Sequence, residues 1–210
     1  MKRISVVTPC YNEEENVRPL HQAVAEVFAA LPQYDYEHIF IDNASRDGTV
    51  AELRTMAVSD PRVKVIVNTR NFGHIRSPFH GLLQAGGDAA ILMACDFQDP
   101  PGLLREFLSF WEQGFRVVVG VKTAADESIV IFSIRKLYYD LVNRLAEVEL
   151  TKNTTGFGLY DRAVLDTLRA VDDPYPYFRG LVSDLGYRTA KVEFHQPGRR
   201  RGVTKNNFYT

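Results

Sequence analysis

The stretch at residues 90–101, AILMACDFQDPP, decides how the rest of the chain is interpreted. Residues 90–94 form an apolar run with the length of a buried strand, which predicts a strand that stops at Asp96, Gln98 and Asp99. Ligands bind at the carboxyl ends of strands in open α/β sheets, and oxygen ligands of this kind suit Mg²⁺ or Mn²⁺. The stretch therefore predicts a site for a metal and a phosphate. The alternative is that Asp96 and Asp99 only cap a helix starting near Pro101.

Composition indicates an ordinary globular α/β domain. The chain has 210 residues, 45% of them hydrophobic and 24% charged, with a formal net charge of −1, so nonspecific nucleic-acid binding is not indicated. The two cysteines form no disulfide framework, which favours a reducing, cytoplasmic compartment, and no apolar run is long enough to span a bilayer. Residues 188–205 carry six basic side chains against the single acid Glu193, which predicts an anion-facing region.

Strand and helix patterns alternate along the first half of the chain. The expected strands are residues 4–8, 37–41, 63–67 and 90–94. The expected helices are residues 13–31, 49–58, 77–85, where glycines 86–87 would form a C-cap turn, and 103–112. Four strand–helix units in succession predict a parallel, doubly wound sheet.

A polar cluster follows each of these four strands, at residues 11–13, 42–47, 71–74 and 96–99. Because parallel strands end at the same edge of a sheet, the clusters favour a site for a nucleotide or a phosphorylated ligand. The glycine-rich loops of dehydrogenases and of NTPases are both absent from the sequence, which argues against those two classes of enzyme.

The second half predicts fewer strands and one long helix. A strand is expected at residues 116–121 and a helix at 129–148, which either packs on the core or lies on a membrane surface. The two glycines of residues 154–160 would let a ligand approach the backbone. Asp161 is expected to cap a helix that runs to residue 171, followed by a helix ending at 185, a strand at 191–195 and a basic loop at 198–205.

Taken in order, the motifs resemble those of the family-two inverting glycosyltransferases, and within that family the dolichol- and polyprenyl-phosphate sugar transferases. The similarity spans essentially the whole chain. The motifs are PCYNE (9–13), IDNASRDGT (41–49), RNFGH (70–74), GD (87–88), DFQDPP (96–101), GFGLYDR (156–162), YFRGL (177–181) and RRRGVTK (199–205). The resemblance implies a GT-A, Rossmann-like fold in one catalytic domain, residues 1–210, with a nucleotide-sugar-binding half (1–100) and an acceptor-binding half (101–210).

The resemblance also implies roles for individual residues. The nucleotide of a UDP- or GDP-sugar would be held by Pro9, Tyr11, Asn12, Glu13, Asp42, Asn71 and Gly73. Asp96 and Gln98 match the metal and diphosphate motif, and Asp96, Asp99 and Asp184 are the candidate catalytic residues. Arg199 and Lys205 match a mobile basic loop that closes over phosphates, and Arg201 of the same loop is a further candidate. Lys122 and Arg135 are candidate phosphate and acceptor ligands that could substitute where the chain departs from the family pattern.

The implied reaction is an in-line displacement at the anomeric carbon of the sugar, with inversion. A polyprenyl-phosphate acceptor needs no general base, because the second pKa of a phosphate monoester is about 6. A sugar hydroxyl would need a carboxylate, and Asp99 and Asp184 are the candidates. Three departures from the family pattern affect this interpretation: Ala94 replaces a usual acidic metal ligand, Phe132 a usual arginine, and residues 156–158 an acidic Phe-Arg motif.

Relatives of this type continue into transmembrane helices after the basic loop, whereas the sequence stops at Thr210. The expectation is therefore either the catalytic portion of a longer membrane protein or a peripheral protein at the cytoplasmic membrane face, with homo-oligomer formation open. Two other functions are weighed: transfer to a glycan hydroxyl in cell-surface polysaccharide synthesis, and a non-catalytic nucleotide-sugar-binding domain. A nucleotidyltransferase would need a G-x-G-T-R loop, which residues 9–13 lack.

Overall fold

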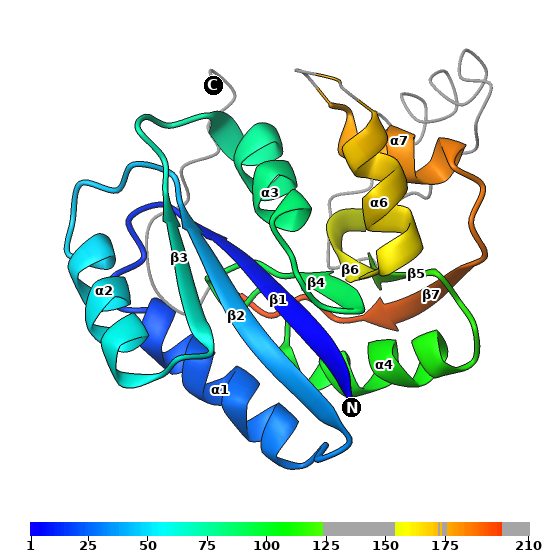
Figure 1. Ribbon diagram of the computed structural model, residues 1–210, viewed down its shortest axis with the longest axis horizontal. Helices are drawn as coiled ribbons and strands as arrows, with labels where there is room; N and C mark the ends of the chain where they lie inside the picture. Colours follow the sequence, from blue (N-terminus) through cyan, green and yellow to red (C-terminus); the bar gives the residue numbers. More distant parts are fainter. Residues whose placement is uncertain (124–153, 172, 174–175, 199–210) are drawn as a thin grey trace.

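The computed structural model describes residues 1–123, 154–171, 173 and 176–198. These residues form one seven-stranded sheet with the strand order β3-β2-β1-β4-β6-β5-β7 (Figure 1). The strands are β1 (Lys2–Cys10), β2 (Tyr34–Asp42), β3 (Val63–Val67), β4 (Ala89–Leu92), β5 (Val117–Lys122), β6 (Thr154–Asp161) and β7 (Thr189–Phe194). Each neighbouring pair is parallel except for the two that involve β6, so the predicted mostly parallel α/β sheet is confirmed.

Helices cover both faces of this sheet, as Figure 1 shows. They are α1 (Val17–Ala29), α2 (Thr49–Ser59), α3 (Gly73–Leu83), the 3₁₀ turn η1 (Pro101–Leu103), α4 (Leu104–Glu112), α6 (Arg162–Ala170) and α7 (Phe178–Asp184). Helices α1, α2 and α4 bury their apolar side chains in one core, and α3, α6 and α7 bury theirs in a second core on the opposite face. None of the helices in the described ranges is long and apolar enough to cross a membrane. The predicted helix at 129–148 lies outside the described residues.

The central strand β1 explains why the sheet has two cores. Ile4 and Val6 point into one core and Val7 into the other, and all three side chains are fully buried. Successive side chains of a strand point to opposite faces, so a continuous β-branched run can fill both cores only when both faces are covered. This is the pattern from which a buried parallel strand was predicted.

The first helix begins four residues later than the sequence predicted. The backbone oxygen of Glu13 accepts hydrogen bonds from the backbone nitrogens of Asn16 (2.9 Å) and Val17 (3.1 Å), which closes a turn ahead of the helix. Glu14 accepts a hydrogen bond from the backbone nitrogen of Gly48 (2.6 Å). Glu13 and Glu14 therefore belong to a loop that contacts the next strand–helix unit, and they do not open the helix.

The third helix, α3, also differs from the prediction. It begins at Gly73 and ends at Leu83, and the glycines that follow do not form a left-handed cap. A Cβ at Gly87 would lie 2.6 Å from the backbone oxygen of Arg3, and the backbone nitrogen of Asp88 donates to that oxygen. These residues are glycine and aspartate because the turn lies directly against β1, so the predicted C-cap turn is wrong.

Residues 154–160, predicted as a ligand-approach segment, form an antiparallel strand inserted between β4 and β5. A Cβ at Gly158 would lie 2.5 Å from the backbone oxygen of Val118, so this glycine permits close strand packing. Asp161 ends the strand and caps α6, because its carboxylate accepts from the backbone nitrogen of Ala163 (2.9 Å), and the predicted cap is confirmed.

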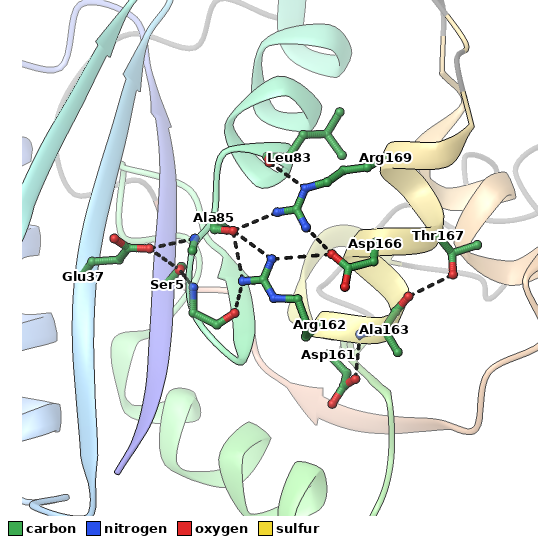
Figure 2. Close-up of polar contacts among 12 residues, drawn as sticks. Ser5, Glu37, Leu83, Ala85, Asp161, Arg162, Ala163, Asp166, Thr167 and Arg169 are labelled. Carbon is green, nitrogen blue, oxygen red and sulfur yellow. Dashed lines mark hydrogen bonds and ion pairs between the residues drawn. The ribbon is translucent and has the colours of Figure 1, made fainter.

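Two arginines of α6 bind the carbonyl groups at the end of α3, as Figure 2 shows. Arg162 donates to the backbone oxygens of Ala85 (3.0 Å) and Gly87, and Arg169 donates to the backbone oxygen of Leu83 (2.9 Å). The last carbonyls of a helix have no partner within the helix, and cations there are favourable. The arginines therefore fasten the second half of the chain to the first.

A buried carboxylate holds the other side of the same turn. Glu37, whose side chain is fully buried, accepts hydrogen bonds from the Ser5 hydroxyl (2.6 Å) and the backbone nitrogen of Gly86 (2.9 Å). The Ser5 hydroxyl in turn accepts from the backbone nitrogen of Gly87 (2.8 Å) (Figure 2). The turn after α3 is thus fixed from β1, β2 and α6 together.

We predict that Arg162→Ala destabilises the fold by about 1–3 kcal/mol, because the backbone oxygen of Gly87 loses its arginine donor, although that of Ala85 keeps a hydrogen bond from Arg169 (2.8 Å). At this chain size the thermal midpoint should fall by several degrees. Arg54→Ala is the matched control, since Arg54 is an exposed residue of α2. Equal midpoints for the two variants in thermal denaturation would contradict the assigned role of Arg162.

Candidate nucleotide-sugar and acceptor site

The carboxyl ends of four parallel strands meet at one edge of the sheet. Cys10 at the end of β1 pairs in register with Asp42 at the end of β2, and β3 and β4 lie parallel on either side. The backbone nitrogen of Asn43 donates to the oxygen of Cys10 (2.9 Å), and that of Asn68 donates to the oxygen of Asp42 (2.9 Å). The four polar clusters named from the sequence therefore lie along a single edge, as predicted.

The loops after β1 and β2 bind each other. The backbone nitrogen of Asn12 donates to the Ser45 hydroxyl (2.8 Å), and the Asn12 side chain accepts from the backbone nitrogen of Arg46 (2.7 Å). Asn12 and Ala44 both have positive φ angles, 56° and 63°. This conformation costs a non-glycine residue roughly 1–2 kcal/mol, and such residues concentrate at ligand sites. The pattern supports the assignment of this edge as a binding site.

Asp42 is fully buried beneath these loops. Its carboxylate accepts hydrogen bonds from the backbone nitrogen of Ser45 (3.0 Å) and from the Ser45 hydroxyl. The geometry therefore places Asp42 as a residue that shapes the loop after β2.

Asn43 connects the loop after β2 to the start of α3. Its side-chain nitrogen donates to the Asn71 side chain (2.8 Å) and to the backbone oxygen of Gly73 (3.2 Å). Its side-chain oxygen accepts from the Asn68 side chain (3.2 Å) and from the backbone nitrogen of Phe72 (2.8 Å). The sequence reasoning did not single out Asn43, although it lies within one of the quoted motifs. Its only signal was an amide next to Asp42 at a strand end.

The loop after β4 departs from the sheet earlier than predicted. β4 ends at Leu92, and Asp99 turns back so that its carboxylate accepts from the backbone nitrogen of Ala94 (2.7 Å). Asp96 accepts from the backbone nitrogen of Gln98 (3.2 Å). Pro100 occupies the N-cap position of the helical turn at Pro101 and makes no side-chain cap hydrogen bond, so neither acid is the N-cap residue of that turn.

The pKa of Asp99 is raised to about 6. Burial is the main cause, because the side chain is almost wholly removed from water and desolvation disfavours its charged form. The hydrogen bond from Ala94 lowers the pKa, the charge of Asp96 raises it, and the charge of Lys122 lowers it. A buried carboxyl with this pKa beside a pocket is a candidate proton acceptor.

A pocket of about 510 Å³ opens beside this loop. Its polar lining includes Gln98, Asp99, Lys122 and Arg179. Its apolar lining includes Phe79 of α3 and Phe178 of α7, whose ring centroids lie 5.9 Å apart, together with Leu92, Met93 and Phe157. The cavity therefore combines charged groups with apolar walls, which suits a ligand that has both characters.

The structure brings some of the predicted site residues together in this pocket. Pro9, Gln98, Asp99 and Lys122 line it. Gly156 also lines it and has a φ of +91°, so one of the two glycines predicted to admit a ligand does face the pocket. Arg179 was missed in the assignment of site residues, although it belongs to a quoted motif. A basic residue near the start of a short helix was its only sequence signal.

Other predicted residues lie elsewhere. Along the carboxyl edge, but outside the pocket lining, are Tyr11, Asn12, Glu13, Asp42, Asn71, Gly73 and Asp96. Asp184 is exposed at the last position of α7 and does not line the pocket. Four predicted phosphate and acceptor ligands lie outside the described residues: Arg135, Arg199, Arg201 and Lys205.

Within the ranges that the structure describes, no group of three or more His, Cys, Asp or Glu side chains could hold a metal ion. Mg²⁺ is nevertheless often bound by one or two carboxylates together with substrate phosphates. Asp96, almost fully buried in the loop after β4, fits that mode of binding, with Gln98 beside it.

Comparison with known proteins identifies the family. The family model described as "Glycosyl transferase family 2" matches residues 5–169. The chain belongs to glycosyl transferase family 2. The resemblance inferred from the motifs is therefore confirmed, and the match extends from within β1 to the last turn of α6.

Two curated relatives of this family 2 chain align over nearly its whole length. "Uncharacterized glycosyltransferase YkcC" of Bacillus subtilis (strain 168) is 34% identical over 202 residues, which covers 96% of this chain and 62% of the relative. "Bactoprenol glucosyl transferase" of Shigella phage SfV is 31% identical over 206 residues, covering 98% and 67%. The chain thus spans roughly two thirds of the length of these relatives.

A solved structure shows the same fold. Glucosyl-3-phosphoglycerate synthase from Mycobacterium tuberculosis, in complex with Mn²⁺, UDP and glucosyl-3-phosphoglycerate, superposes with a TM-score of 0.61 at 18% identity. The superposition covers 96% of this chain and 73% of the synthase. The predicted GT-A fold is confirmed by this likeness.

We predict that Asn43→Ala destabilises the protein by about 1–3 kcal/mol, because two donors and two acceptors around the start of α3 each lose one hydrogen-bond partner. Hydrogen exchange should also accelerate at the backbone amides of residues 72–73. Gln22→Ala, at an exposed position of α1, is the control. Unchanged exchange at those amides in Asn43→Ala would show that the loop holds its shape without this side chain.

Proposed function

We propose that this chain is the catalytic domain of an inverting glycosyltransferase that moves a sugar from a UDP- or GDP-sugar to a polyprenyl phosphate at the cytoplasmic face of a membrane. The observation that carries the proposal is the pocket beside the ends of β1 and β4. There Gln98, Asp99 and Lys122 adjoin apolar walls, next to the loops that bind each other across β1 and β2.

The donor assignment rests on the carboxyl edge of the sheet. Positive φ angles at Asn12, Ala44 and Phe97 shape the loops after β1, β2 and β4. Turns of this kind hold polar groups around a ligand at the switch between strands β1 and β4. The nucleotide would lie over Pro9, Tyr11 and the loops near Asp42, in the first half of the chain (1–100).

The acceptor assignment rests on the pocket lining and on the relatives. Lys122 and Arg179 would attract a phosphate, and the apolar residues of α3 and α7 would accept the hydrocarbon next to it. A relative 31% identical is named a bactoprenol glucosyl transferase, which favours a lipid phosphate over a soluble sugar. The second half of the chain (101–210) would thus select the acceptor.

The chemistry would need charge stabilisation more than proton transfer. A divalent metal bound at Asp96 and the donor's phosphates would stabilise the charge that grows on the departing diphosphate. Lys122 and Arg179 would orient the acceptor phosphate, whose oxygen is already anionic near neutral pH because its second pKa is about 6. The apolar walls would keep water from competing with the acceptor.

A second candidate function is transfer to a glycan hydroxyl, and the raised pKa of Asp99 favours it. A carboxyl with a pKa of about 6 lies in the range suited to a general base. In that reaction Asp99 would accept the proton of the hydroxyl. Asp184, exposed at the end of α7, does not line the pocket.

We predict that the chain transfers labelled sugar from a UDP- or GDP-sugar to a short-chain polyprenyl phosphate in detergent, and that the matching polyprenol accepts none. Asp96→Asn should lower kcat/KM by about 100-fold or more, because charge stabilisation at the leaving group is typically worth that much. Glu26→Gln, at an exposed carboxylate of α1, should retain full activity. Binding of UDP or GDP without transfer to either acceptor would favour the non-catalytic alternative.

We also predict that Asp99→Asn keeps kcat/KM within about tenfold of the parent protein when the acceptor is a polyprenyl phosphate. The activity of both proteins should fall below about pH 6, since that limb follows ionisation of the acceptor phosphate. If Asp99 is instead the general base for a hydroxyl, Asp99→Asn should lose about 100-fold to 10,000-fold. Rates of both proteins across pH 5–8, with phosphate and hydroxyl acceptors compared, distinguish the two reactions.

A further inference from the structure

Exposed apolar side chains gather at the mouth of the pocket. Large exposed hydrophobic side chains are few in the described part of the chain: Met1, Val58, Val67, Ile75 and Tyr177. Ile75 of α3 is 44% exposed and Tyr177, just before α7, is 51% exposed, and both also line the pocket. A side chain that lines a pocket and is exposed lies at its opening. Single exposed apolar residues are common, but two that flank one opening need an explanation.

Arginines contact two aromatic rings, one just before α3 and one just before α7. The Arg70 guanidinium lies 4.1 Å from the centre of the Phe72 ring, and Arg76 lies 5.6 Å from the same ring. Arg179 lies 6.0 Å from the centre of the Tyr177 ring and donates to a backbone oxygen of β6 (2.8 Å). Ile75, Tyr177 and Arg179 line the pocket, and Arg70, Phe72 and Arg76 lie near Ile75 in the chain. We call these six residues the mouth rim.

The segment that contains α3 has no acidic side chain. Residues 61–87 contain no aspartate or glutamate, although the whole chain carries 26 acidic residues and a net charge of −1. The same stretch includes two arginines of the mouth rim and also His74 and His80, both exposed. The charged side chains of α3 and of the loop before it, Arg70 and Arg76, are therefore both basic, and they lie near the exposed Ile75 in the chain.

The elements that carry the mouth rim are fixed in place. The Asn43 side chain holds the residues before α3, and the rings of Phe79 and Phe178 join α3 to α7. Figure 1 shows α3, α6 and α7 on the same face of the sheet. The mouth rim is thus a preformed surface built from two helices that are far apart in the sequence.

We propose that the mouth rim docks onto the headgroup layer of an anionic membrane, so that the pocket opens directly into the lipid surface. Aromatic side chains with arginines are the composition that this layer favours, and basic residues are attracted to anionic lipids. An acceptor with a phosphate headgroup and an apolar tail could then reach Lys122 and Arg179 without leaving the bilayer. This inference rests on the proposed function and adds to it the surface of the protein that contacts the membrane.

The test places an environment-sensitive dye at the mouth rim. Ile75→Cys provides a single attachment point, because Cys10 and Cys95 are buried and burial raises the pKa of both thiols. Val58→Cys, 91% exposed at the far end of α2, is the matched control. The probe is a vesicle of phosphatidylcholine with phosphatidylglycerol, compared with phosphatidylcholine alone and with vesicles that carry brominated lipid.

With phosphatidylglycerol present, the fluorescence emission of the dye at position 75 should shift to shorter wavelength and should be quenched by brominated lipid. The emission of the dye at position 58 should show neither change. In co-sedimentation, Ile75→Ser should weaken binding to these vesicles about tenfold, and Arg70→Gln about fivefold. Val58→Ser should bind like the parent protein. Equal signals at the two dye positions, no signal at position 75 while the protein sediments with vesicles, or no vesicle binding at all would each overturn the proposal.

The vesicle-binding test and the sugar-transfer assay can each fail without the other. The docking test contains neither donor nor acceptor, so it can succeed in a protein that transfers nothing. The transfer assay uses a short-chain acceptor in detergent, so it can succeed without a membrane. Loss of docking alone therefore removes this inference and leaves the proposed function, whereas loss of transfer alone does the reverse.

Discussion

The pairing of β1 with a parallel strand on each side is the constraint on which the rest of the structure depends. β1 lies between β2 and β4, and because all three run in the same direction, their loops must emerge at the same edge. The loops joined by Asn12 and Ser45 and the turn that contains Asp96 follow from this geometry, and the pocket lies beside them. Away from the carboxyl edge, the contacts stabilise the fold, as where Glu37 accepts a hydrogen bond from the turn after α3.

The candidate site combines local strain with dense hydrogen bonding. Asn12, Ala44 and Phe97 adopt positive φ angles in the loops after β1, β2 and β4, at a cost that the surrounding contacts must offset. The offset is visible at Ser45, which binds both Asn12 and Asp42, and at Asn43, which binds the residues before α3. Rigid loops of this kind position a ligand without paying for ordering when it binds.

The contacts that join the two halves of the chain could not be predicted from the family motifs. Arg162 belongs to a motif quoted for its resemblance, yet in the structure it binds the backbone oxygens of Ala85 and Gly87 in the turn that follows α3. This contact joins the turn after α3 to α6, and the Phe79–Phe178 ring pair joins α3 to α7. The pocket and the mouth rim therefore depend on an interface between segments about 80–100 residues apart in the chain.

The sequence by itself determined the fold class, the strands of the first half and the edge where their polar clusters lie, because apolar periodicity and strand ends are local signals. It also determined the family, through motifs such as residues 96–101. Only the tertiary structure decided that residues 154–160 form an antiparallel strand, that Asp99 is buried with a raised pKa, and that Arg179 and Ile75 share a pocket with Lys122. These features depend on long-range contacts, and a single sequence records which residues are present but not which distant neighbours cover them.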